Sequence, residues 1–277
     1  MGEARRRSRH KKEVLSSEPR CIYCSAAANS LEHMPPVSIF RGRKRLSGLE
    51  FACCIECNGG TKAADAIAAL MSFVSRPENE KSWQAIEVQR LLSAADNLAP
   101  GFRTELLGDS SEAARWRYTR SGLLVRGYDA NGSGPILKRH MDVFSAKLGM
   151  ALYREHVGQA LPLTGRVYSR WFLNGGLSDE TANAILSILP VPETLRMGKQ
   201  VATEQFAYRF NCDERSILAA MAGFHSNLHV LTFATSDPDT YGPVLTKMRD
   251  VHGLRGPWFD TMSPGELVQR LVKPVAS

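Results

Sequence analysis

Short apolar runs separated by turn-forming residues characterise the chain up to about Thr61. This pattern favours strands joined by loops, and the strand candidates are residues 37–40 and 49–53. Apolar residues then recur every three or four positions, which predicts a helix that begins near Glu56 or Asn58 and ends at Arg76. The N-terminal part is therefore expected to run strand, loop, strand, helix.

The remainder of the chain shows both helical and strand-like periodicity. Helices are predicted over residues 81–98, 135–157 and 178–189, extended chain over 161–174, 205–211 and 228–235, and a hairpin over 113–128. Because helices and strands are grouped rather than strictly alternating, the pattern indicates an α+β fold. We expect a basic flexible tail over 1–17, a small unit over 18–77 with its boundary near 76–79, and a larger mixed α+β domain of unknown role over 78–277.

Composition and charge narrow the class of protein. The 277 residues are 43% hydrophobic and 23% charged, without an apolar run long enough to cross a bilayer or a secretory signal after the N-terminal basic residues. We therefore expect a cytoplasmic protein with no membrane partner. The net charge is +7, of which residues 1–62 carry +6. Such a basic region attracts polyanions, because each neutralised phosphate releases counterions.

Two Cys-x-x-Cys pairs, separated by 29 residues, contain four of the six cysteines. They are Cys21, Cys24, Cys54 and Cys57. In a cytoplasmic protein this spacing favours a metal site over disulfides, and four thiolates form the closed tetrahedral shell of a structural Zn²⁺ site. Cys53 breaks the spacing and, on a strand, would point away from Cys54. Cys212 is expected to be a small buried hydrophobe.

The sequence LEHMPP between these pairs sets Glu32 beside His33 and ahead of two prolines. Hydrolysis of a phosphodiester needs a base and a hard cation. The imidazole of His33 suits proton abstraction near pH 7, whereas the oxygens of Glu32 and Asn58 suit Mg²⁺ or Mn²⁺. Pro35 and Pro36 would stiffen the bend that brings Glu32 and His33 into one site.

Together these motifs resemble the HNH endonuclease family, and in particular bacterial proteins that read Glu-His-x-Pro-Pro and then Cys-x-x-Cys-Asn. The similar stretch runs from about Cys21 to Asp65. The resemblance implies a ββα-metal fold stapled by structural zinc. It also implies cleavage of DNA, with His33 as general base and with Glu32 and Asn58 holding the catalytic Mg²⁺ or Mn²⁺.

The sequence departs from the family at the central asparagine that holds the catalytic loop and histidine in place. Its position falls near Leu49, and Ser47 or Glu50 could substitute for it. Basic residues around the motif are candidate phosphate contacts. They are Arg41, Arg43, Lys44, Arg45 and Lys62.

The leading hypothesis is a metal-dependent HNH-type endonuclease that acts on DNA, with RNA as an alternative substrate, in a setting such as bacterial defence or a mobile element. The runner-up is a zinc-stapled nucleic-acid-binding module whose catalytic loop has degenerated. The missing asparagine favours the runner-up, and the intact Glu32, His33 and Asn58 favour the enzyme. A third hypothesis, a zinc-dependent protein-interaction module, does not explain the basic N-terminal part. The sequence leaves open whether the protein forms a homodimer.

Overall fold

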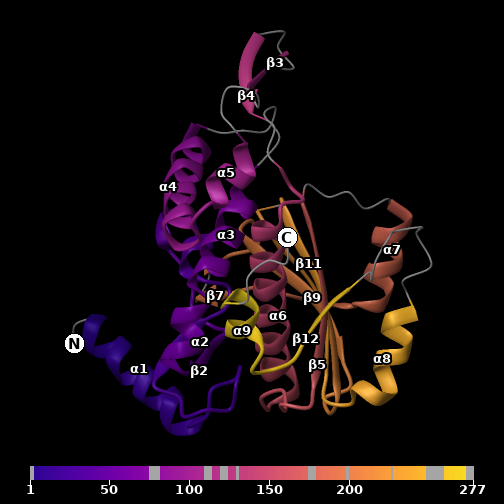
Figure 1. The fold of residues 1–277 in the computed structure, drawn as a ribbon. Helices are drawn as coiled ribbons and strands as arrows, with labels where there is room; N and C mark the ends of the chain where they lie inside the picture. Colours follow the sequence, from indigo (N-terminus) through magenta and orange to yellow (C-terminus); the bar gives the residue numbers. More distant parts are fainter. Residues whose placement is uncertain are drawn as a thin grey trace.

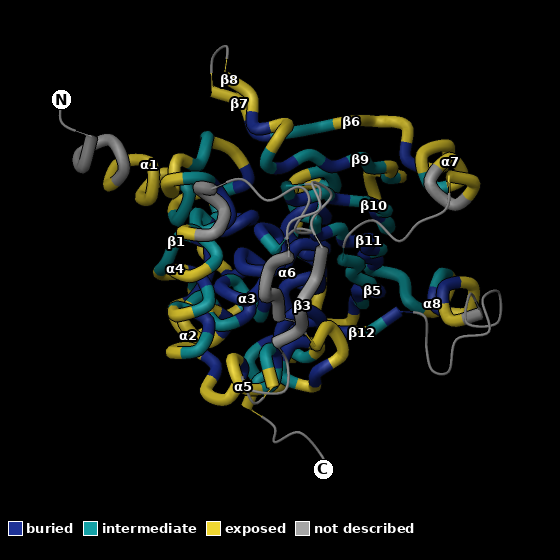
Figure 2. Tube along the Cα trace, turned by 90° about the horizontal axis from the view of Figure 1, so that it is seen from above, coloured by how far each residue is buried: buried dark blue, intermediate teal, exposed yellow. Residues whose placement is uncertain are grey.

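A computed structural model describes residues 3–74, 82–108, 114–118, 124–128, 131–173, 179–197, 200–225, 227–247 and 259–272. The elements lie in layers (Figure 1). The N-terminal helices and a short hairpin pack on one side of the long helix α6 (Pro135–Val157), and a six-stranded antiparallel sheet packs on the other side. Figure 2 shows the same layers from above, and the most buried segments are α6 and the strands next to it.

The N-terminal layer contains short elements joined by tight turns. They are α1 (Glu3–Ser17), β1 (Ser30–His33), the 3-10 turns η1 (Val37–Ile39) and η2 (Arg41–Arg43), β2 (Glu50–Cys53), α2 (Ile55–Gly60), α3 (Lys62–Phe73), α4 (Ser82–Leu98) and α5 (Phe102–Leu107). β1 and β2 pair antiparallel, with His33 opposite Glu50 and Ser30 opposite Cys53. The single helix predicted from near residue 56 to Arg76 is two helices, α2 and α3, which break at Thr61, and Arg76 lies outside the described residues. The helix predicted over 81–98 is confirmed as α4.

Two sequence predictions for this layer differ from the structure. The segment expected to be a flexible tail is helical from Glu3 to Ser17, and it contacts both strands of the hairpin. The strand predicted over 37–40 is the 3-10 turn η1, and the first strand lies earlier, at β1. The reason is that Pro35 and Pro36 have no backbone N–H group, so the backbone pairing ends at Met34, whose N–H donates to the carbonyl oxygen of Leu49.

The C-terminal part forms the main sheet and its flanking helices. Its elements are β3 (Ala114–Tyr118), β4 (Leu124–Tyr128), α6, β5 (Arg166–Leu173), α7 (Asp179–Ile188), β6 (Val191–Glu193), β7 (Arg196–Met197), β8 (Gln200–Val201), β9 (Phe206–Cys212), β10 (Ile217–Phe224), β11 (Leu228–Thr235), α8 (Pro238–Lys247), β12 (Asp260–Met262) and α9 (Leu267–Val272). The sheet order is β12-β5-β11-β10-β9-β6. The predicted hairpin, helices and strands are confirmed, and mixed helix and sheet confirm the α+β class.

The long apolar run of residues 217–224 is the central strand β10, in which every second side chain is buried. One sheet face packs against α6, and the other carries a smaller apolar cluster to which residues next to α7 and in α8 contribute. No helix in the described ranges is both long and apolar enough to cross a membrane.

α6 packs closely against the sheet because Gly149 lacks a side chain. A Cβ atom there would lie 2.4 Å from Oγ1 of Thr232 and 2.8 Å from Val167. Buried residues of the N-terminal layer, of α6 and of the sheet belong to one continuous cluster that extends from Cys21 to Leu267. The two expected domains therefore share a core, and the boundary expected near 76–79 lies outside the described residues.

Lys147 joins α6 to the N-terminal layer through charge. Its side chain is fully buried, and its Nζ lies 2.8 and 2.9 Å from the two carboxylate oxygens of Asp65 in α3. The same Nζ is 3.2 Å from Oε1 of Glu32 in β1. A buried ammonium without partners is strongly destabilising, so this three-residue network fixes the position of β1 and α3 on α6.

We expect Lys147→Met to lower the free energy of unfolding by about 3–5 kcal/mol, because it leaves two carboxylates buried without their cation. Urea denaturation followed by circular dichroism measures the change. Lys138→Met on the same helix is the matched control, because Lys138 is 59% exposed although it pairs with Asp142. Its expected cost is below about 1 kcal/mol.

A triple variant, Glu32→Gln with Asp65→Asn and Lys147→Met, separates charge from packing. It removes all three charges together, so it should be more stable than the Lys147→Met single variant. Equal losses for Lys147→Met and Lys138→Met would refute the role given to the buried network.

Candidate functional site

The four cysteines of the two Cys-x-x-Cys pairs form one cluster. Their sulfur atoms all lie within 4.8 Å of one another. Cys21 and Cys24 lie in the turn after a single bridge between Arg20 and Ala27, and Cys54 and Cys57 lie at the start of α2. The predicted set is therefore brought together, and it can bind a structural metal such as zinc.

Local backbone geometry prepares these sulfur atoms as metal ligands. The backbone N–H of Tyr23 donates to Sγ of Cys21 at 3.4 Å, and the N–H of Cys57 donates to Sγ of Cys54 at 3.3 Å. Hydrogen bonds from the thiols of Cys53 and Cys57 lower the pKa of Cys21, whereas the same contact with Cys21 raises the pKa of Cys57. Because the thiolate is the form that binds a metal, the donor set and its surroundings fit such an ion.

Glu32, the proposed ligand of a catalytic cation, points into the core. Its side chain is only 3% exposed, and Oε1 is bound to Lys147. Burial raises the pKa of this carboxyl to about 7, although Lys147 acts in the opposite direction. The other oxygen, Oε2, is buried and has no hydrogen-bond partner. A phosphate at the surface could not share a cation with this enclosed carboxylate.

Asn58, the second proposed ligand, is used to hold β1. Its Nδ2 donates to Oγ of Ser30 at 2.8 Å and to the carbonyl oxygen of Leu31 at 3.1 Å. The side chain of Glu32 is directed instead to α6. The arrangement therefore does not fit the expected Mg²⁺ or Mn²⁺ held jointly by Glu32 and Asn58.

His33 lies on the opposite side of β1 from Glu32, and its side chain is 37% exposed. Its Nε2 is 3.9 Å from Oε1 of Glu50, the residue that faces it across the hairpin. The other carboxylate oxygen of Glu50 contacts Nε2 of His10 in α1. Glu50 therefore contacts two histidines from separate elements. It is also one of the two residues, with Ser47, that could substitute for the central asparagine of the HNH motif.

Arg45 completes the surroundings of Glu50 from the preceding loop. Nη1 lies 3.4 Å from Oε1 of Glu50. The guanidinium also donates to five backbone carbonyl oxygens, of Met34, Pro35, Leu46, Gly48 and Leu49, at 2.5–3.2 Å. Its side chain is only 3% exposed, so the predicted phosphate contact by Arg45 is wrong. The residue orders its own loop, in which Gly48 and Leu49 have positive φ angles of 108° and 51°.

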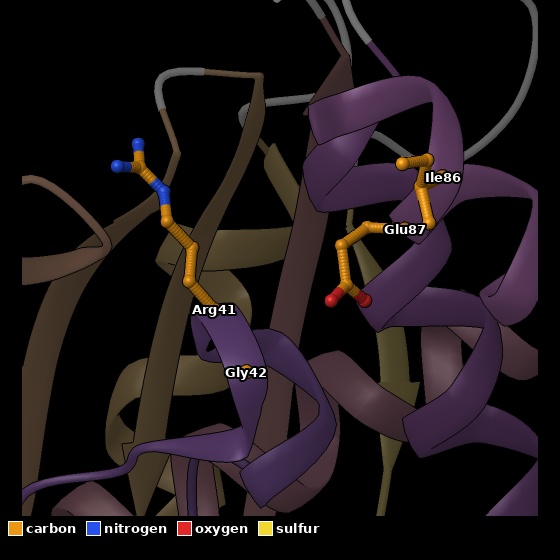
Figure 3. A pocket seen from close by; sticks show the side chains of 4 residues that line it. All are labelled: Arg41, Gly42, Ile86 and Glu87. Carbon is orange, nitrogen blue, oxygen red and sulfur yellow. The ribbon is translucent and has the colours of Figure 1, made fainter. Parts of the chain in front are cut away.

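The other proposed phosphate-binding residues are at the surface. Arg43, Lys44 and Lys62 are exposed, and Arg41 is half-buried. Figure 3 shows Arg41 beside a shallow depression between η2 and α4, with Glu87 on its other side. The lining residues Arg41, Gly42, Ile86 and Glu87 do not include His33 or a cysteine, so this depression is separate from the motif.

Three further exposed basic residues lie on α1, and no sequence motif distinguishes them individually. They are Arg9, Lys11 and Lys12. The basic composition of the N-terminal segment indicates that it attracts polyanions. Composition alone does not predict that this segment is a helix beside the hairpin. His10 lies between them in sequence and contacts Glu50, which places this part of α1 next to His33.

Three histidines outside the motif, His140, His156 and His225, contact backbone carbonyl groups or aromatic rings. A ring nitrogen of His140 lies 2.8 Å from the carbonyl oxygen of Ile136. The ring of His156 stacks on Phe210 at a centroid distance of 3.6 Å.

Comparison of the chain with protein-family models, curated proteins and solved structures gives no significant match. The likeness to HNH enzymes therefore depends on the motif residues alone. A four-cysteine cluster occurs in many kinds of protein and does not identify that family.

Proposed function

We propose that this chain binds nucleic acid through a surface centred on Glu50, and that the four-cysteine cluster holds the structural zinc that supports this surface. We call the exposed residues Arg9, Lys11, Lys12, Arg43 and Lys44 the basic rim. The observation that carries the proposal is the position of Glu50. Its carboxylate contacts His10 of α1, His33 of β1 and Arg45 of the loop, and so holds the two segments that present the rim, α1 and the loop, beside His33.

The charges of this surface favour a polyanion. Glu50 is already engaged by Arg45 and by the two histidines. The side chains of the rim are exposed to solvent, although Arg9 also pairs with Glu13 on the same helix. Lysine and arginine contacts to phosphates supply affinity without reading sequence. DNA is the expected partner, with RNA as the alternative.

Phosphodiester hydrolysis is the second candidate function, and one specific observation favours it. The imidazole of His33 is partly exposed within the basic rim, with the Glu50 carboxylate on one side. A carboxylate in that position can orient a histidine that acts as a general base. We rank nucleic-acid binding above hydrolysis because Glu32, the carboxylate next to His33, is buried in an ion pair with Lys147.

We expect purified protein to contain about one zinc ion per chain, since a four-thiolate site holds one tetrahedral ion. Cys54→Ser should reduce the metal content and destabilise the N-terminal layer, because zinc binding and folding are coupled. Elemental analysis and amide hydrogen exchange measure these effects. Cys212→Ser, in a half-buried cysteine on β9, is the control and should retain the metal. Folded wild-type protein without zinc would rule out the proposed centre.

Replacement of basic-rim residues should weaken binding to a short DNA duplex. For Arg43→Gln with Lys44→Gln, we expect the slope of log K against log salt to decrease by about two, one for each lost phosphate contact. Fluorescence anisotropy at several salt concentrations gives the slope.

The control carries two equivalent charge losses near the other end of α6, in Arg103→Gln with Lys138→Gln. Both residues are exposed, and the C-terminal part of α6 is the part that contacts Glu18, directly after α1. Equal slopes for wild type and both variants would exclude the basic rim as the binding surface.

Nicking of supercoiled plasmid with Mg²⁺ or Mn²⁺ distinguishes the two candidate functions. We expect bound DNA to remain intact, because Glu32 cannot bring a cation to the surface in this arrangement. Nicking by wild type that is lost in His33→Ala and with EDTA would establish the hydrolase instead. His33→Ala that nicks like wild type would point to a contaminating nuclease.

A further inference from the structure

The fifth cysteine of the N-terminal layer is adjacent to the metal-binding cluster. Cys53 is fully buried at the end of β2, and its Sγ lies 3.7 Å from Sγ of Cys21. With both thiols protonated, Cys21 donates to Cys53, and Cys53 donates to the carbonyl oxygen of Cys54 at 3.4 Å. The spacing of the Cys-x-x-Cys pairs leaves this residue without a role.

Cys21 bound to a metal is a thiolate and has no proton to donate. We propose that the thiol of Cys53 then donates a hydrogen bond to Cys21, and that this bond determines how tightly the cluster holds its metal. The inference depends on the zinc centre proposed above. Cys53 is then a positioning residue that acts through Cys21 and does not contact the metal.

Geometry favours a donor over a fifth ligand. The four sulfur atoms that all lie within 4.8 Å of one another exclude Cys53, so Cys21, Cys24, Cys54 and Cys57 complete a tetrahedral shell. The sulfur atom of Cys53 contacts that shell at Cys21. A thiol in this position can donate to a neighbouring thiolate while the thiolate keeps its bond to the metal.

Charge explains why one weak donor matters here. Zinc with four thiolates carries a net charge of about −2, and Cys21 and Cys57 are almost completely buried. Hydrogen bonds to the sulfur atoms spread this charge and offset the loss of water. Cys21 accepts one from the Tyr23 backbone at 3.4 Å. As a thiolate it can accept a second from the Cys53 thiol, which lies 3.7 Å away in a different segment.

Paired substitutions at Cys53 separate donation from packing. Cys53→Val removes the donor and approximately retains the volume, whereas Cys53→Ser retains a hydroxyl donor. Cys53→Ala is a second donor-free variant that does not depend on the fit of valine. Cys212→Val is the matched control, because Cys212 packs at the edge of the core on β9, outside the cluster.

The measurement is competition for zinc between the full-length protein and a chromogenic chelator. We expect Cys53→Val and Cys53→Ala to bind zinc about tenfold more weakly than wild type, as for other residues that hold a metal ligand in place. Cys53→Ser and Cys212→Val should retain wild-type affinity. Wild-type affinity in both donor-free variants would overturn the inference while leaving the zinc centre intact.

Cobalt substitution adds a spectroscopic test of whether Cys53 is a ligand. The intensity of the thiolate-to-cobalt charge-transfer band reports the number of bound thiolates. We expect the same four-thiolate intensity in wild type and Cys53→Val, with a shifted band energy because the Cys21 thiolate has lost a donor. A lower intensity in Cys53→Val would show that Cys53 is a ligand and would overturn the donor role. Wild type that binds neither zinc nor cobalt would refute the metal centre itself.

Discussion

The position of the N-terminal layer depends on one buried charge, the ammonium of Lys147. It is shielded from water and requires the carboxylates of both Glu32 and Asp65, which come from β1 and α3. The hairpin and the following helix are therefore oriented by a residue in the centre of the C-terminal part. The same contact directs Glu32 inward, so the buried network that holds the layers together also decides which of the motif residues face solvent.

The short hairpin separates structural support from surface chemistry. At one end Ser30 pairs with Cys53, next to the cysteine cluster, and at the other His33 pairs with Glu50. Three residue steps along a strand span about 10 Å, so a metal on the cysteines would lie too far from His33 to act on a substrate there. A metal there would hold the turn of Cys21 and Cys24 against the start of α2, while α1 and the loop ordered by Arg45 shape the exposed end.

Local patterns predicted much of this fold. Helical periodicity located α4 and α6, and cysteine spacing located the cluster. Local patterns could not predict which residues far apart in the sequence contact each other. Nothing near Glu32 in sequence signals Lys147, and nothing in the basic loop distinguishes Arg45, which binds backbone carbonyls, from exposed Arg43. α1 has few apolar positions for a periodic signal, and its contact through His10 forms only after folding.

The continuous core from Cys21 to Leu267 limits how this protein can change by recombination. A gene segment that ended after α3 would encode Glu32 and Asp65 without the lysine that neutralises them. The motif therefore cannot be exchanged between proteins as a separate cassette, unlike a module with its own core. Descendants that alter Lys147 must also alter its two acidic partners, so the three positions are expected to be inherited as one unit.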